Sequence, residues 1–285
     1  MQPKESINDF VIKFANVNGT GSASANGMFA KAIFRMGIPV RPRNIFPSNI
    51  QGLPTWYEVR VSQDGYLGRR GGVDMMISVN PQSFAKDVSE VEPGGYMVYD
   101  TTKPLDLRHV RRDVNYLGIP LTEMCLREYT DSRQRQLFKN VIYVGALAAL
   151  LNIDFAILKD LVREQFKGKE KLITPNIHAL EMGHQYASTH FTCPLGIHLK
   201  AGEQKPKHIE KSDQILMDGN TATALGAVYG GATVTAWYPI TPSTSVLAAV
   251  EKYCRRSRIH PGTGKENFAH AQPDHQPPPI GLVIR

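Results

Sequence analysis

The opening forty residues contain the feature that most restricts the fold: an apolar segment, a glycine turn, a helical segment and a second extended segment in direct succession. Residues 10–17 are nearly all apolar and predict a buried strand. Asn-Gly-Thr-Gly at 18–21 predicts a tight turn, and residues 23–36 have helical periodicity up to Gly37. Extended sequence resumes at 38–40. Two strands joined through a helix form a βαβ unit, which requires a parallel sheet.

The same alternation of strand and helix patterns continues along the chain. Repeated signals of this kind predict an α/β fold, a Rossmann-like domain with a mostly parallel sheet. The predicted strands are 56–62, 73–79, 96–99 and 113–117, and the predicted helices are 83–88 and 139–151.

The composition changes near residue 200. Residues 201–212 are rich in Lys, Glu and Gln and hold a proline, which is typical of a linker. After it, a small-residue helix at 213–229, a strand at 233–237 and a helix at 242–253 indicate the start of a second α/β domain. We therefore predict a first domain at 1–200, a linker at 201–212 and an incomplete second domain at 213–285.

The charge of the chain argues against a nucleic-acid partner. The net charge is +7, from 33 Lys and Arg against 26 Asp and Glu. The basic residues are scattered, and no recognisable nucleic-acid-binding motif accompanies them. A hydrophobic share of 42% is typical of an ordinary globular core, and the excess positive charge also suits an anionic cofactor.

Location and metal content follow from the cysteines and the apolar runs. Cys125, Cys193 and Cys254 stand far apart, without a CxxC pair, which indicates a reducing cytoplasm and argues against an iron–sulfur cluster or structural zinc held by this chain. No secretory signal is visible, and the longest apolar run, 141–151, is too short to span a membrane.

A histidine-rich region raises a metal alternative. Its residues are spaced more widely than the usual zinc pairs, so polar or packed side chains are the preferred interpretation and we expect no metal. The residues concerned are His178, His184, His190, Cys193 and His198.

The glycine turn is a candidate binding site. Gly19, Gly21 and Ser22 stand after a strand and before a helix, where backbone N–H groups and the helix dipole can hold a phosphate. Ser24 replaces the third glycine of a dinucleotide fingerprint, and Arg41 lies where an acidic ribose partner would be expected. A nicotinamide cofactor is therefore not indicated. A tight structural turn and a phosphate or CoA contact both remain open.

A second candidate site is the segment Tyr238-Pro239-Ile240-Thr241-Pro242-Ser243, between a predicted strand and a predicted helix. Its two prolines fix the backbone around Thr241, so the threonine hydroxyl is held in place. Ser243 is expected to cap the following helix. The alternative is a rigid connector with no chemical role.

With these motifs in view, the chain resembles the alpha subunit of 2-oxoacid:ferredoxin oxidoreductases, with a gamma domain fused ahead of the alpha domain. The resemblance to the thiamine-binding-type alpha domain lies in the 238–243 motif, in Asp218-Gly-Asn220 and in the small-residue helix up to Gly231. The resemblance to the gamma domain lies in the glycine turn followed by AKAIFRMGIPV and in NIFPSNIQGLPTWYEVRVS, GYLGRRGGVD and VEPGGYMVYD. The resemblance extends to about Phe268, and within the family the chain is most similar to the 2-oxoglutarate type.

The resemblance implies a subunit of an oxidoreductase. In this family the alpha subunit pairs with a beta subunit, and the active site lies at their interface. Thiamine diphosphate, Mg²⁺ and a [4Fe–4S] cluster are held mainly by beta, CoA accepts the acyl group, and ferredoxin accepts the electrons. The expected reaction is oxidative decarboxylation of a 2-oxoacid to acyl-CoA and CO₂, with no cofactor held by this chain alone and neither nucleic acid nor membrane as a partner.

The resemblance also assigns roles to single residues. Thr241 would hydrogen-bond an oxygen of the substrate, with the rest of the 238–243 motif around it. Arg69 and Arg70 would contact anions near the interface, or else form a solvated turn. Asp274 stands nearest the position of a glutamate that contacts thiamine in the family, and three prolines follow at 277–279. We therefore expect a truncated product that is inactive alone; the alternative function is a stand-alone nucleotide- or CoA-binding module without catalysis.

Overall fold

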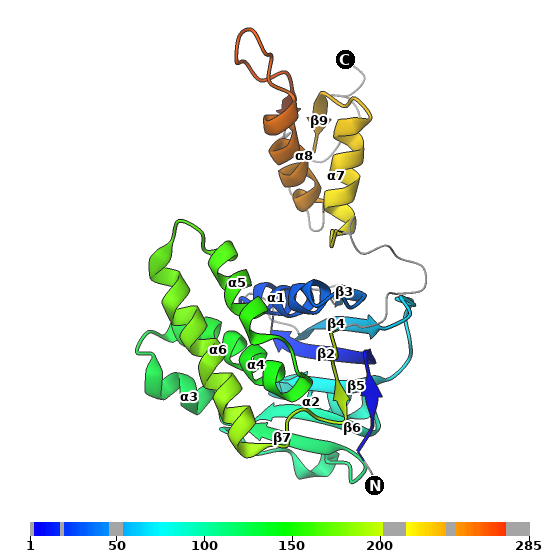
Figure 1. Ribbon diagram of the computed structural model, residues 1–285, viewed down its shortest axis with the longest axis vertical. Helices are drawn as coiled ribbons and strands as arrows, with labels where there is room; N and C mark the ends of the chain where they lie inside the picture. The colour runs from blue at the N-terminus through cyan, green and yellow to red at the C-terminus, as the bar shows by residue number, and fades with distance from the viewer. Residues whose placement is uncertain (1–2, 18–19, 46–53, 202–214, 238–242, 272–285) are drawn as a thin grey trace. The chain divides into compact units, whose positions relative to one another are not determined.

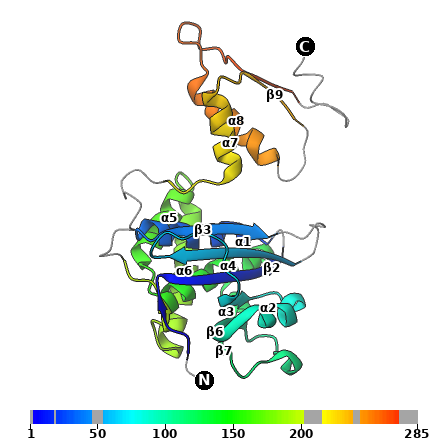
Figure 2. The same ribbon diagram turned by 90° about the vertical axis from the view of Figure 1, so that its right-hand side faces the viewer.

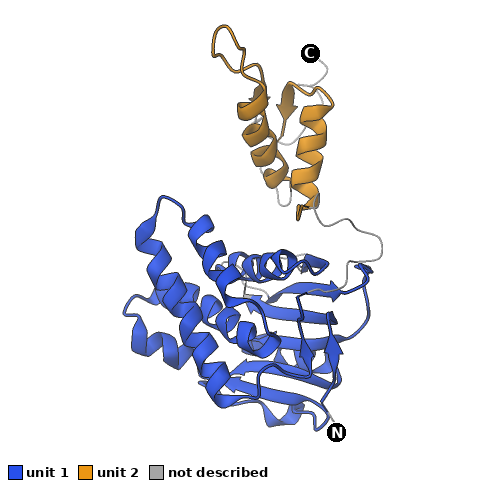
Figure 3. Ribbon diagram, viewed as in Figure 1, with its two compact units in different colours: residues 1–214 blue, residues 215–285 orange. Residues whose placement is uncertain are grey.

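The computed structural model describes residues 3–17, 20–45, 54–201, 215–237 and 243–271. The chain forms two compact units, residues 1–214 and 215–285 (Figure 3). Each unit is described by itself.

A six-stranded sheet is the centre of the first unit (Figure 1). Its strand order is β3-β4-β2-β5-β6-β7. The four strands β2, β5, β6 and β7 run parallel, whereas β4 is antiparallel to both β2 and β3. The strands are β2 (Asp9–Val17), β3 (Val40–Ile45), β4 (Pro54–Ser62), β5 (Val73–Ser78), β6 (Val91–Asp100) and β7 (Asn115–Ile119).

Helices cover the two faces of this sheet unequally, as Figure 2 shows. One face carries α1 (Ser22–Arg35), α4 (Ser132–Leu151), α5 (Phe155–Gln165) and α6 (Glu170–His190). The other carries the short α2 (Phe84–Glu90). The remaining elements of the unit are β1 (Ser6–Ile7), η1 (Pro81–Ser83), η2 (Leu107–His109), α3 (Leu121–Glu128) and β8 (Ile197–His198).

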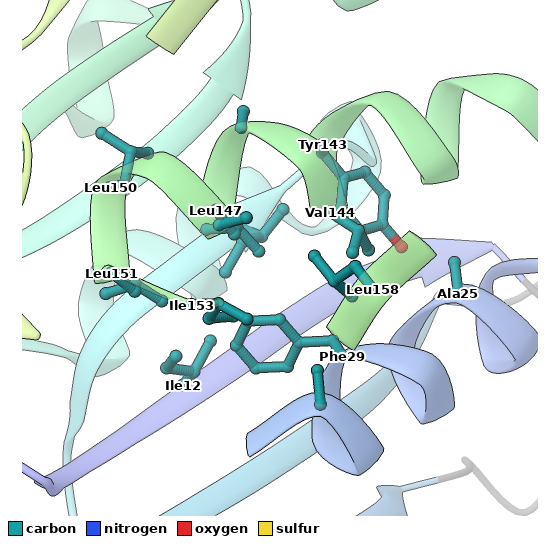
Figure 4. Close-up of a cluster of buried hydrophobic side chains, with 14 of the residues drawn as sticks. Ile12, Ala25, Phe29, Tyr143, Val144, Leu147, Leu150, Leu151, Ile153 and Leu158 are labelled. Carbon is teal, nitrogen blue, oxygen red and sulfur yellow. The ribbon is translucent and has the colours of Figure 1, made fainter. Parts of the chain in front are cut away.

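The alternation of side chains along β2 explains why the sheet has a hydrophobic core on each face. Phe10, Ile12 and Phe14 of β2 belong to the core beneath α1 and α4, whereas Ala15 belongs to the core beneath α2. Successive side chains of a strand point to opposite faces, so a strand that is apolar at nearly every position is buried on both. Figure 4 shows Phe29 of α1 among side chains from β2, α4 and α5 in the larger core.

The structure confirms the predicted α/β fold with a mostly parallel sheet, and it differs in one strand. The strand predicted at 96–99 begins earlier, because β6 starts at Val91 and runs through Pro93-Gly94-Gly95. The register between β5 and β6 shifts between Val73 and Met75, and a bulge of this kind accommodates glycine inside a strand.

The second unit is a small α/β arrangement. It contains α7 (Gly219–Tyr229), β9 (Val234–Ala236), α8 (Thr244–Ser257) and β10 (Ala269–Ala271), with β9 and β10 paired in parallel. Ala224, Val228, Val250 and Cys254 are buried between its helices. Val234 remains 55% exposed, so this core covers β9 only partly.

No helix in the described ranges combines the length and the apolar character needed to cross a bilayer.

Apart from Ala201, the predicted linker lies outside the described residues, and it can be tested by limited proteolysis. If 201–212 connects two compact units, trypsin should cut first after Lys207 or Lys211 and leave a stable N-terminal fragment. Mass spectrometry of a digestion time course would identify this fragment. A first cut elsewhere, with the 201–212 segment intact, would contradict the linker.

Candidate functional site

The strand order reverses between β2 and β5, and this marks the first place to look for a site. From β2 the chain passes through α1 to β3 on one side, and from β5 it passes through α2 to β6 on the other. The two helices lie on opposite faces of the sheet. In open α/β sheets, ligands bind beyond the carboxyl ends of the strands at such a switch point. The glycine turn leaves β2 at this edge.

Helix α4 holds the glycine turn in place. Asn140 donates a hydrogen bond from Nδ2 to the carbonyl of Thr20 (2.8 Å), and the buried Tyr143 hydroxyl donates to Oδ1 of Asn26 (2.7 Å). Gly21 has a φ of 77°, and a Cβ atom there would lie 2.4 Å from Cδ2 of Leu137. A left-handed backbone against a neighbouring side chain favours glycine. The described part, Gly21 and Ser22, therefore begins α1 at the predicted place; Gly19 lies outside the described residues.

A buried carboxylate follows β5 at the same edge. Asp87 is fully buried and accepts hydrogen bonds from Nε1 of Trp56 (2.8 Å) and from the hydroxyls of Ser78 (2.9 Å) and Ser83 (2.7 Å). Burial raises the pKa of Asp87, and the three hydrogen bonds oppose that rise. The side chain joins β4, β5 and α2, so it fixes the shape of this edge.

A second buried carboxylate ends β6. Lys139 lies with Nζ 2.9 Å from Oδ2 of Asp100 and 3.1 Å from Oγ1 of Thr122. Burial alone would raise the pKa of Asp100, but the Thr122 hydroxyl and the Lys139 ammonium outweigh it, and the pKa lies below its usual value. Asp100, Lys139, Ser78 and Tyr99 line a hollow of about 110 Å³ beyond β5 and β6.

We expect Lys139→Met to lower the free energy of unfolding at pH 7 by about 1–2 kcal/mol, because it leaves a buried carboxylate short of a partner. The pKa of Asp100 is lower in the folded than in the unfolded state. Its stabilising contribution is therefore present above about pH 3.9 and is lost as the pH falls through the folded value. The deficit of the variant should be largest at neutral pH and shrink below about pH 4.

Urea unfolding at pH 7 and at acidic pH would measure this difference. Lys103→Met is the matched control, because exposed Lys103 lines the same hollow. It should change stability by no more than about 0.5 kcal/mol. A Lys139→Met deficit that is equal at both pH values would disprove the role assigned to the ion pair.

The arginines predicted as anion contacts lie at the opposite edge of the sheet. They precede β5, whereas the glycine turn follows β2, which runs parallel to it. Arg70 forms an ion pair with Asp74, a fully buried carboxylate that also pairs with Lys4 and accepts a hydrogen bond from the N–H of Val11 (2.7 Å). The structure thus separates Arg69 and Arg70 from the glycine turn; their role as anion contacts stays a prediction.

Most of the second predicted site lies outside the described residues, namely 238–242 and Asp274. The described strand β9 and helix α8 stand on either side of the 238–243 motif in the chain, as expected. The predicted capping role of Ser243 is wrong. It occupies the N-cap position of α8 in helical conformation, and its side chain makes no capping bond, because a cap normally requires an extended backbone.

The histidine-rich region gives no metal site in the described ranges, where no three His, Cys, Asp or Glu side chains come together to hold an ion. His178 lies 2.9 Å from a carboxylate oxygen of Glu128, and His190 stacks on Tyr186. Cys125 is buried, which raises the pKa of its thiol to about 11.

Sequence reasoning missed the polar residues that end the parallel strands. Asn16 is the next-to-last residue of β2, Asn80 follows β5 and Asp100 closes β6, and all three are buried. A polar residue at the end of an apolar strand was the available signal, since the carboxyl ends of parallel strands meet at one edge.

Comparison with known proteins bears on what this arrangement does. Residues 11–186 match the family described as pyruvate ferredoxin/flavodoxin oxidoreductase. The chain is 26% identical over 282 residues to 2-oxoacid:ferredoxin oxidoreductase 2, subunit alpha, of Aeropyrum pernix, a match that covers 86% of this chain and 43% of that protein. It therefore spans less than half the length of this relative.

Two further proteins resemble parts or most of the chain. The 2-oxoglutarate synthase subunit KorC of Archaeoglobus fulgidus is 25% identical over 176 residues, 61% of this chain and 88% of that subunit. A solved 2-oxoglutarate:ferredoxin oxidoreductase from Magnetococcus marinus, with 2-oxoglutarate, coenzyme A and succinyl-CoA bound, matches with a TM-score of 0.74 and 26% identity over 94% of this chain and 43% of that one. Since the family match covers more than half of the sequence, the chain belongs to the pyruvate ferredoxin/flavodoxin oxidoreductase family.

Proposed function

We propose that this chain forms the N-terminal part of an alpha subunit that, together with a beta subunit, converts 2-oxoglutarate and CoA to succinyl-CoA and CO₂ and passes electrons to ferredoxin. The observation that supports this most is the similarity to the Magnetococcus marinus enzyme over 94% of the chain, because it extends beyond the first unit. That enzyme has 2-oxoglutarate, coenzyme A and succinyl-CoA bound, which supports the substrate and the acyl acceptor proposed here.

The residues of this chain would bind and position rather than carry out the redox steps. Thiamine diphosphate, when bound, supplies the carbanion chemistry of the family. Thr241 would donate a hydrogen bond to an oxygen of the 2-oxoacid, within a loop fixed by Pro239 and Pro242. Gly21 and Ser22, at the start of α1, would contact a phosphate of CoA through backbone N–H groups.

Substrate identity is tested with the complete alpha subunit purified together with its beta subunit. We expect reduction of ferredoxin to require both CoA and a 2-oxoacid, and kcat/KM to be higher for 2-oxoglutarate than for pyruvate. Omission of CoA is the control. Preference for pyruvate would overturn the substrate, and failure to reduce ferredoxin with any 2-oxoacid would overturn the activity.

A second function, a stand-alone module that binds CoA or another nucleotide, is favoured by the glycine turn at the switch point. Calorimetry of this chain alone with CoA and with NADPH distinguishes the two proposals. Micromolar binding of CoA without a beta subunit would support the module. We expect no such tight binding, because the alpha–beta proposal places the site at a subunit interface.

A further inference from the structure

The helical layer of the first unit contains a cavity to which the proposed function assigns no ligand; of the residues assigned to that function, Gly21 also lines this cavity. It has a volume of about 380 Å³ and lies between α1, α4, α5 and α6. Ligand pockets in proteins measure about 300–1,000 Å³, so this one can hold a small molecule. It opens among helices, whereas the switch-point site lies beyond the ends of the strands.

The interior of this pocket is apolar. Much of its wall is formed by Met28 of α1, Val141 of α4, Val162 of α5 and Phe166, which follows α5. At its lining, Leu137 and Leu172 are 45% and 43% exposed, which is high for leucine. A guest with an apolar body would remove these surfaces from water.

The charge at the lining of the pocket is positive. Lys171 is the only charged residue among its described lining residues. None of the ion pairs found within the described ranges includes it. Two polar lining groups are already used: Nε2 of Gln165 donates to Oγ of Ser24 (2.9 Å), and Nδ2 of Asn176 donates to the carbonyl of Leu172 (2.7 Å). A single unpaired cation beside an apolar pocket is complementary to an anionic head on an apolar tail.

We propose that this pocket binds an amphipathic monocarboxylate, with its apolar tail between α1, α4 and α5 and its carboxylate at Lys171. A tail of roughly eight to ten carbons suits a cavity at the small end of the usual range. The proposal concerns the first unit alone and neither the beta subunit nor the 2-oxoacid site. The pocket shares Gly21 with the proposed CoA contact, but the ligand proposed for it differs and is held at Lys171.

Calorimetry with octanoate and 1-octanol on the whole 285-residue chain tests the proposal. We expect octanoate to bind with one-to-one stoichiometry and a Kd of roughly 0.1–1 mM, and 1-octanol to bind about three- to fivefold more weakly. Lys171→Glu should weaken octanoate binding about tenfold and leave 1-octanol unaffected. Lys167→Glu, with the same change in charge outside the pocket lining, should behave as the unsubstituted chain does.

Two substitutions that fill the pocket show where octanoate binds. Ser24→Trp and Leu172→Trp place a large ring in the pocket from opposite walls, and both positions are exposed, so folding should survive in at least one variant. Each folded variant should lose octanoate binding. Undiminished binding in them, equal binding of octanoate and 1-octanol, or no binding by the unsubstituted chain would overturn the proposal. The last result would indicate that the exposed leucines contact a protein partner instead.

Discussion

We expect Gly183→Ala to destabilise the first unit by about 2–3 kcal/mol, although alanine is the better helix former. Helices α4 and α6 cross with their backbones in contact. A Cβ atom at Gly183 would lie 1.9 Å from the carbonyl oxygen of Ile142 and 2.8 Å from the backbone nitrogen of Ala146. Backbone atoms cannot rotate away as a flexible side chain can, so the helices must separate. Overpacking of this kind costs about 1–3 kcal/mol, sometimes more.

Urea unfolding followed by far-UV circular dichroism would measure the effect. Gly27→Ala in α1 is the matched control, because no atom lies within 4 Å of its added Cβ. That substitution should stabilise by about 0.5–1 kcal/mol through helix propensity alone. If Gly183→Ala were as stable as Gly27→Ala, the close approach of α4 and α6 would be refuted.

The same crossing predicts the effect of its second glycine. A Cβ at Gly145 would lie 2.0 Å from the carbonyl oxygen of Leu180, so Gly145→Ala should also destabilise the unit. Because both substitutions push the same two helices apart, the double variant should lose less than the sum of the two single losses.

The largest effect on activity is expected for Thr241→Ala in the complete alpha subunit assembled with beta. If the Thr241 hydroxyl donates to an oxygen that gains charge in the transition state, its loss should lower kcat/KM for the 2-oxoacid by roughly 10²–10³-fold, or about 2.7–4 kcal/mol. Steady-state kinetics with ferredoxin as the acceptor would show it. Thr241 lies outside the described residues, so the prediction rests on the resemblance of the 238–243 motif.

Thr223→Ala is the control for this experiment. Thr223 is exposed on α7 of the same unit, and its hydroxyl bonds to the carbonyl of Gly219 within the helix. It should leave the kinetics unchanged. Equal kinetics for both variants would remove Thr241 from the substrate site, and a drop in thermal stability confined to Thr241→Ala would indicate a connector role instead.

The sequence was most informative where local patterns and the fold agree. The apolar run at 10–17 predicted a strand, and the glycine turn predicted the start of α1. Both were confirmed, because periodicity and the left-handed backbone at Gly21 are local properties.

The sequence was less informative about the helical layer. Helices α3, α5 and α6 were not predicted, and α6 in particular has Pro175 and several histidines within it. Its helical state follows from packing: Ala179, Gly183 and Ala187, four residues apart, form a narrow ridge against α4. Such a ridge is visible in the sequence only after its partner helix is known.

The sequence by itself determined the family, the α/β class and the places where strands give way to turns, because these depend on residues that are neighbours in the chain. The tertiary structure alone decided which polar residues share one edge of the sheet. Lys139 pairs with Asp100 at the end of β6 and Ser78 at the end of β5 bonds to Asp87, whereas Arg69 and Arg70 lie at the other edge, where Arg70 pairs with Asp74. The physical reason is that strand order and direction fix which chain segments become neighbours, and no local pattern encodes them.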